Sequence, residues 1–177
     1  IKKKRYKKIY LPKYISDTVY NTINIKIEFY DIDKNFYPIL NLKSVNKSVG
    51  SALLYPNYFG INNNNITKLK KKIKNLIIDN VHAFFHKPKN LDVIYSARKF
   101  FGVPDGAYLV SSDKFDVKIS KDYSFDRYTP LLKKIELGSD KSYLEYLKIE
   151  KRLNKAGPRS MSKLTSLFLK SFDYSEE

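Results

Sequence analysis

The sequence contains no cysteine, no tryptophan and only two histidines in 177 residues. Without cysteine there can be no disulfide framework, and the redox compartment stays undecided. Zinc sites usually draw on several cysteine or histidine ligands at short spacing, so this composition argues against a closed metal site. The sequence also lacks a Ser-His-Asp elbow and a GxxxxGK phosphate loop, which argues against the hydrolases and nucleotide-binding proteins that use them.

Long apolar segments are absent as well. No run approaches the roughly 18 apolar residues that a membrane-spanning helix needs, so we expect no membrane span. The N-terminus is basic, but no apolar stretch of roughly 7 to 15 residues follows it, which argues against a secretory signal peptide. These absences make a cytoplasmic location the default expectation.

Acidic residues are scarce, with 18 Asp and Glu against 34 Lys and Arg and a formal net charge of +16. A charge of this size could attract nucleic acid through counterion release. However, the excess consists of 29 lysines against 5 arginines and comes with abundant Asn and Ile, the pattern that an AT-rich coding bias produces. Because base recognition relies on arginine forks, we expect no specific nucleic-acid binding, and a basic nucleic-acid-binding domain is the weaker alternative.

One basic cluster lies on a predicted helix. Ile66, Leu69 and Ile73 recur at helical spacing and predict a buried face. The last of four consecutive asparagines, Asn65, could cap this helix. The helix then carries on its solvated outer face Lys68, Lys70, Lys71, Lys72 and Lys74.

The apolar residues predict one core and an α/β fold. They make up 42% of the chain, which is enough for a single core of ordinary size. Residues 76–78 and 93–95 are short apolar runs without polar alternation, which is typical of strands covered on both faces of a parallel sheet. Residues 52–55 form a third such run.

Polar residues follow the ends of two of these predicted strands. Asp79 follows residues 76–78, and Ser96 and Lys99 follow residues 93–95. Ligands of open α/β sheets bind outside the carboxyl ends of the strands, so we expect Asp79 and Lys99 at the same edge. Pyridoxal phosphate (PLP) needs a carboxylate against its pyridine nitrogen and a lysine for its aldehyde. This order of residues is therefore what a PLP site requires.

At these residues the chain resembles a known family. The stretch is similar to the cofactor-binding core of fold-type I PLP enzymes, specifically the DegT/StrS-like sugar aminotransferases, and weaker likeness extends over residues 7–174. The residues that carry the resemblance are Asp79, His82, Ser96, Lys99, Gly102 and Gly106.

The resemblance implies a role for each candidate residue. Asp79 would pair with the pyridinium nitrogen, His82 would lie near the ring or phenolic oxygen, and Ser96 would reach the phosphate. Lys99 would be the catalytic residue that holds PLP as a Schiff base. Asn57, at the end of an earlier strand, matches a position that approaches the phenolic oxygen.

The resemblance also implies a three-layer α/β sandwich with a mostly parallel sheet, as in the large domain of PLP transferases. Residues 1–135 would form the core of this domain, and residues 136–177 would form a helical segment leading toward a small domain. The sequence has no counterpart of the family's N-terminal phosphate-binding segment or of its C-terminal domain. We therefore expect a truncated large domain that binds PLP weakly and has little or no transaminase activity.

The implied parent enzyme transfers an amino group from an amino-acid donor to a nucleotide-sugar substrate in surface-polysaccharide biosynthesis. It would act as a homodimer or with a partner chain. The alternative is a non-catalytic remnant, or a partner subunit of a PLP-fold protein.

Simpler interpretations of the single residues stay open. Taken alone, Asp79 is more often a turn or helix-cap residue, and His82 is more often structural. Arg98 could bind a substrate carboxylate or form a structural ion pair. His86 lies in a predicted loop, and the connection between the strands at 76–78 and 93–95 leaves room for only a short helix.

Overall fold

The computed structural model describes residues 4–115, 118–153 and 157–172. The chain divides into two compact units. The first unit comprises Ile1–Tyr95 and Tyr108–Phe115, and the second comprises Ser96–Ala107 and Asp116–Glu177. The predicted boundary at residue 135 stays a prediction.

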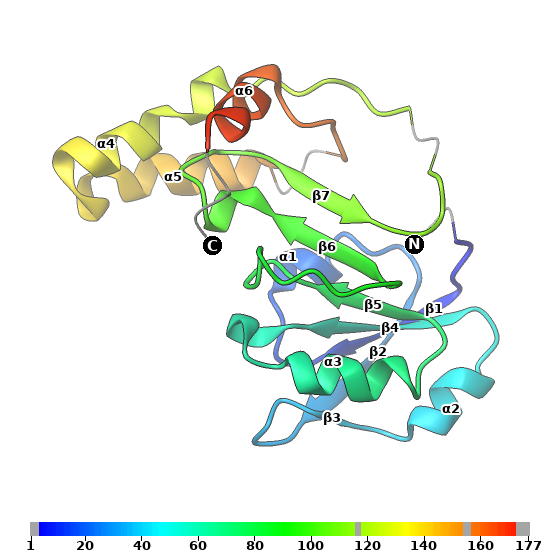
Figure 1. Cartoon of the computed structure of the whole chain (residues 1–177). Coiled ribbons are helices and arrows are strands. Elements are labelled where there is room, and N and C mark those ends of the chain that lie inside the picture. Colours follow the sequence, from blue (N-terminus) through cyan, green and yellow to red (C-terminus); the bar gives the residue numbers. More distant parts are fainter. Residues whose placement is uncertain (1–3, 116–117, 154–156, 173–177) are drawn as a thin grey trace. The chain divides into compact units, whose positions relative to one another are not determined.

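A seven-stranded sheet runs in the order β3-β2-β1-β4-β5-β6-β7 (Figure 1). The pairs β1 with β2, β1 with β4, β4 with β5, and β5 with β6 are parallel, whereas β2 and β3 are antiparallel. The predicted α/β class with a mostly parallel sheet is therefore confirmed. The strands are β1 (Lys8–Pro12), β2 (Lys26–Ile32), β3 (Pro38–Ile39), β4 (Ser51–Pro56), β5 (Leu76–Asp79), β6 (Asp92–Ser96) and β7 (Ala107–Val110).

Strand β4 shows why the first unit has three layers. All six of its residues are buried, and successive side chains of a strand point to opposite faces. Leu53 and Tyr55 join one apolar cluster, whereas Ala52 and Leu54 join another. Helix α3 (Asn63–Lys70) covers the first cluster, and the segment with α1 (Asp17–Tyr20) covers the second, so that Figure 1 shows α3 in front of the sheet and α1 behind it.

Helix α3 differs from its prediction at both ends. It ends at Lys70, so Lys71, Lys72, Ile73 and Lys74 follow the helix instead of lying on it. It begins at Asn63 after the N-cap residue Asn62, so Asn65 does not cap it. Asn65 is buried instead, and its Nδ2 donates to the carbonyl oxygen of Asn35 (2.8 Å) and to the hydroxyl of Tyr55 (3.0 Å). The asparagine therefore ties the helix to the sheet and to the turn after β2.

The connection from β5 to β6 contains no helix among its described residues, 80–91, although the sequence leaves room for a short one. Its shape comes from side-chain hydrogen bonds to one carbonyl group. Asn80 Nδ2 and the Tyr95 hydroxyl both donate to the carbonyl oxygen of His86, at 2.7 and 2.9 Å. These bonds satisfy a backbone group that a helix would otherwise have paired.

The second unit is helical. Its helix α6 starts at Lys163, after the N-cap residue Ser162, whose Oγ accepts from the amide of Thr165 at 3.1 Å. The buried Asp105 accepts from the amide of Ser162 (2.8 Å), from its Oγ (3.1 Å) and from Thr165 Oγ1. One carboxylate thus anchors the helix to a distant loop.

The remaining elements are short, except for two helices of the second unit. No helix in the described part of the chain is long and apolar enough to cross a membrane. Within the same residues no group of three or more His, Asp or Glu side chains is placed to hold a metal ion. The remaining short elements are α2 (Leu42–Lys47), η1 (Tyr58–Gly60), η2 (Ala97–Lys99) and η3 (Phe125–Arg127), and the two longer helices are α4 (Thr129–Leu137) and α5 (Ser139–Leu153).

Candidate functional site

The carboxyl ends of β4 and β5 bring two predicted site residues together. Asp79 is the last residue of β5 and pairs in register with Pro56, so Asn57 follows beside it. The amide of Asn57 donates to the carbonyl oxygen of Asp79 at 2.9 Å. Both side chains are buried, with exposed fractions of 1% for Asn57 and 7% for Asp79. A carboxylate and an amide therefore meet at the edge where ligands of parallel sheets bind.

Asp79 also has the turn role that its residue type suggests. Its Oδ1 accepts from the amide of Val81 at 2.9 Å, which closes an Asx turn directly after the strand. Burial raises the pKa of the nearby Tyr58 hydroxyl, and the charges of Tyr55, Tyr14 and Asp79 add to this effect. Tyr58 therefore stays protonated at physiological pH, and its hydroxyl donates to the carbonyl oxygen of Tyr14 at 2.9 Å.

His82 lies on the surface beside an aromatic ring that the sequence analysis did not select. Its imidazole is stacked on Phe59, with ring centroids 5.8 Å apart and an interplanar angle of 11°. Phe59 is 60% exposed and has a φ of 55°, a backbone conformation that side-chain-bearing residues seldom adopt. The two rings form a flat, exposed platform. Phe59 lies two residues after Asn57, close to the end of β4. This position is the sequence signal that could have identified it.

The side chain of Asn57 is the centre of a hydrogen-bond network. Its Nδ2 lies 3.2 Å from Asn63 Oδ1, 3.2 Å from Asn80 Oδ1 and 3.3 Å from His86 Nδ1, and its Oδ1 accepts from the amide of Asn62 at 3.3 Å. The network joins the loops after β4 and β5. A cofactor contact from Asn57 would compete with these bonds. Asn80, which is fully buried, and His86 were missed because they act through contacts that are distant in sequence.

His86 should make the stability of this network depend on pH. Burial lowers the pKa of His86 below its usual 6.5. The unfolded state then binds more protons than the folded state, so the stabilising contribution is complete above about pH 6.5 and is lost as the pH falls through the folded-state pKa. We expect the free energy of unfolding to decline from about pH 7 to about pH 5.

Denaturant unfolding at a series of pH values measures this decline. The His86→Gln variant retains a polar side chain but cannot gain a proton, so its profile should be flatter over the same range. Equal declines for the wild-type and variant chains would contradict the role of His86.

The other predicted site residues belong to the second unit. Ser96 is the last residue of β6 and is half-buried, and Lys99 is an exposed residue at the end of η2. The structure places Arg98 in an ion pair with Glu150, which is the structural role that the sequence left open for it. Asn57, Asp79 and His82 lie in the first unit, so the meeting of Asp79 with Lys99 stays a prediction.

Comparisons with known proteins identify no family. No family model matches the chain, and no curated protein matches it. One solved structure is similar, a crystal structure of a PLP-bound protein from Clostridium difficile 630 that is described as an aminotransferase. The sequence identity is 15% and the TM-score is 0.40. The match covers 72% of this chain and 38% of the other, so the chain spans well under half the length of that protein.

Proposed function

We propose that this chain is a PLP-transferase-like domain that holds PLP beyond the carboxyl ends of β5 and β6. The observation that carries the proposal is the buried carboxylate of Asp79 at the end of a parallel strand, with His82 three residues later. The next strand of the sheet, β6, ends at Ser96, and Lys99 follows it directly. The residues occur in the order that PLP chemistry needs.

Two features of the first unit support the binding of a flat heteroaromatic ring. PLP supplies an electron sink when its pyridine nitrogen is protonated. A buried carboxylate such as that of Asp79 stabilises that proton, because an opposite charge in a poorly solvated place favours the charged form. The platform of His82 and Phe59 offers a surface on which a planar ring can stack.

Two further roles belong to the second unit. The hydroxyl of Ser96 would donate to a phosphate oxygen. The amine of Lys99 would bind the cofactor aldehyde covalently and then move a proton at the substrate carbon. In this proposal the reaction is the transfer of an amino group from an amino acid to a nucleotide sugar, carried out by a homodimer or with a partner chain.

A test must separate Lys99 from the 28 other lysines, because PLP reacts with any exposed amine. The chain is mixed with PLP, the adduct is reduced with borohydride, and peptide mass spectrometry locates the modified lysine. We expect modification to concentrate on Lys99. In Lys99→Ala the absorbance band of the adduct should weaken to the level set by nonspecific reaction with the other lysines, because the specific site is lost. In Lys114→Ala it should stay unchanged.

Further outcomes separate the two forms of the proposal. Labelling at Lys99 together with amino transfer from an amino-acid donor supports the enzyme. Labelling at Lys99 without transfer supports the alternative, a non-catalytic relative of the PLP fold. Labelling spread evenly over the lysines, with the same absorbance for Lys99→Ala as for the wild type, would overturn both.

A further inference from the structure

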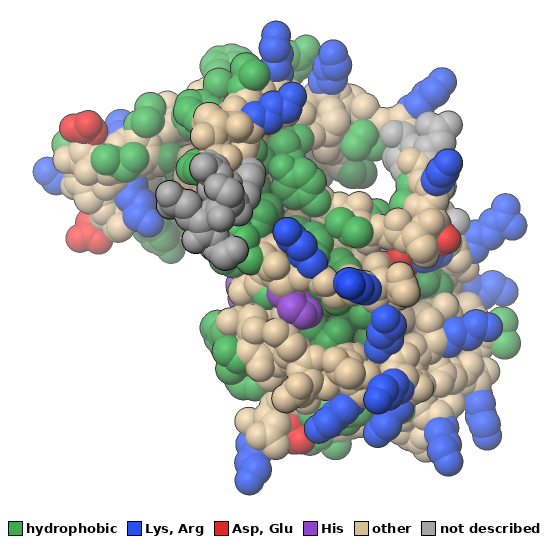
Figure 2. All heavy atoms as spheres, viewed as in Figure 1, with side chains coloured by type: hydrophobic (Ala, Val, Ile, Leu, Met, Phe, Trp, Pro, Cys, Tyr) green, Lys and Arg blue, Asp and Glu red, His purple; other side chains and the backbone are tan. Residues whose placement is uncertain are grey.

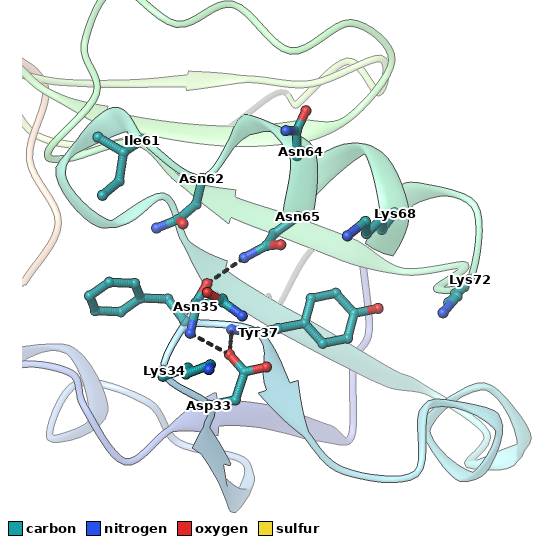
Figure 3. A pocket seen from close by; sticks show the side chains of 11 residues that line it. Asp33, Lys34, Asn35, Tyr37, Ile61, Asn62, Asn64, Asn65, Lys68 and Lys72 are labelled. Atoms are coloured by element: carbon teal, nitrogen blue, oxygen red, sulfur yellow. Dashed lines mark hydrogen bonds between the residues drawn. The ribbon is translucent and has the colours of Figure 1, made fainter.

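A pocket of about 690 Å³ lies in the first unit between the turn after β2 and helix α3 (Figure 3). None of the five residues proposed to contact PLP lines it. Its volume is in the range of pockets that hold small molecules. The lining residues are Asp33, Lys34, Asn35, Phe36, Tyr37, Ile61, Asn62, Asn64, Asn65, Lys68 and Lys72.

The charge of the pocket is positive. Three lysines line the pocket, Lys34, Lys68 and Lys72, against one carboxylate, that of Asp33. This carboxylate is engaged in its own turn, because its Oδ1 accepts from the amides of Asn35 and Tyr37, both at 2.8 Å. Figure 2 shows the same excess on a larger scale, with Lys and Arg side chains gathered over the face that carries α3 and few acidic ones between them. An anion would therefore be attracted here.

The walls of the pocket are held in place by buried polar groups. Asn65 joins the helix to the turn through its bonds to Asn35 and Tyr55, and Asn62 Nδ2 donates to the carbonyl oxygen of Tyr58 at 3.2 Å. Both asparagines are 8% exposed. A site with walls fixed in this way loses little conformational freedom when it binds a ligand.

One polar group in the pocket lacks a partner. The Tyr37 hydroxyl is buried, and among the described residues it makes no hydrogen bond. Lys72 Nζ lies 5.9 Å from the centre of the Tyr37 ring, and Figure 3 shows the hydroxyl directed toward this lysine. A buried hydroxyl without an acceptor is costly, and a ligand oxygen bound beside Lys72 would satisfy it.

The two ends of the pocket differ in chemistry. In Figure 3, Ile61 lies at one end, whereas Lys68 and Lys72 lie at the other. Ile61 is 70% exposed, so it offers apolar surface to a ligand. From this polarity we propose that the pocket binds a phosphate-bearing small molecule whose other end is a planar or apolar group, as in a nucleotide.

The concave shape favours a small molecule over a nucleic-acid strand. A strand would follow the exposed lysines of the surface, including Lys71 and Lys74, which do not line the pocket. A small phosphate ester would contact only the lysines of the pocket wall, such as Lys68 and Lys72. Substituting either the pocket pair or the surface pair of lysines therefore distinguishes the two ligands.

Titration calorimetry with three probes tests the proposal without PLP, so its outcome is independent of the PLP site. ADP carries both a ring and phosphates, adenosine lacks the phosphates, and ribose 5-phosphate lacks the ring. We expect ADP to bind more tightly than either of the others. The double variant Lys68→Gln with Lys72→Gln should weaken ADP binding at least about tenfold, because charge-assisted hydrogen bonds are lost.

The control is Lys71→Gln with Lys74→Gln, which removes the same charge outside the pocket and should change the affinity less than about twofold. Tyr37→Phe should weaken binding of ADP without altering the fold, because only the hydroxyl is lost. Equal effects of the two double variants, or no binding of ADP, would overturn the proposal. A single-stranded oligonucleotide could instead bind more tightly than ADP, with equal loss of affinity in the two double variants. That result would assign this surface to nucleic-acid binding.

Discussion

The variant Asp105→Ala should lose about 3 kcal/mol of unfolding free energy, because one carboxylate accepts three hydrogen bonds and such bonds to a charged group are individually strong. Its donors are buried, with exposed fractions of 2% for Ser162 and 0% for Thr165. The amide of Ser162 would lose its acceptor, and the N-terminus of α6 would lose its link to the loop. The hydroxyls of Ser162 and Thr165 would be left with only Ser124 and Tyr128 as acceptors. Denaturant unfolding followed by circular dichroism measures the loss.

Asp126→Ala is the matched control in the second unit. Asp126 forms an ion pair with Arg152 in which both side chains are substantially exposed, so its removal should cost less than about 1 kcal/mol. If the two variants were equally stable, the carboxylate of Asp105 would not anchor the helix.

The second large effect is expected for Asn57→Ala, which should destabilise the chain by about 2 kcal/mol. The substitution removes the donor that faces Asn63, Asn80 and His86, and it removes the acceptor for the amide of Asn62. Amide hydrogen exchange should accelerate in the loop after β5, because that loop would lose its link to the loop after β4.

The same variant separates a scaffolding role from a cofactor contact. Loss of stability without PLP indicates that Asn57 supports the loops, whereas unchanged stability with weaker PLP binding would indicate a direct contact. Asn64→Ala is the control, because Asn64 is an exposed asparagine of α3 and its loss should cost less than about 0.5 kcal/mol.

Local sequence predicted the sheet well. The apolar runs at residues 52–55 and 76–78 lie in β4 and β5, because burial on both faces leaves an unbroken apolar signal. The run at 93–95 lies in β6, but there Val93 and Tyr95 are buried whereas Ile94 is only half-buried, so this strand is not fully covered on both faces. Local sequence failed where distant side chains decide the structure. The connection from β5 to β6 is shaped by Asn80 and Tyr95, whose partners no pattern could name.

The site shows the same limit. Asp79 could be predicted because a polar residue at the end of a buried strand is visible in the sequence. The stacking of His82 on Phe59 could not, since it depends on how two loops meet. Likewise, Lys68 and Lys72 were expected only on a solvated helix face, and their place in a pocket depends on a turn some thirty residues earlier in the chain.

The two margins of the sheet have different consequences for assembly. β3 has two residues and begins with Pro38, which carries no amide hydrogen, so an additional chain finds little to pair with on that side. β7 ends the other side with Tyr108, Leu109 and Val110 exposed by 39%, 57% and 52%. The short β3 margin, which begins with a proline, is therefore poorly suited to intermolecular strand addition.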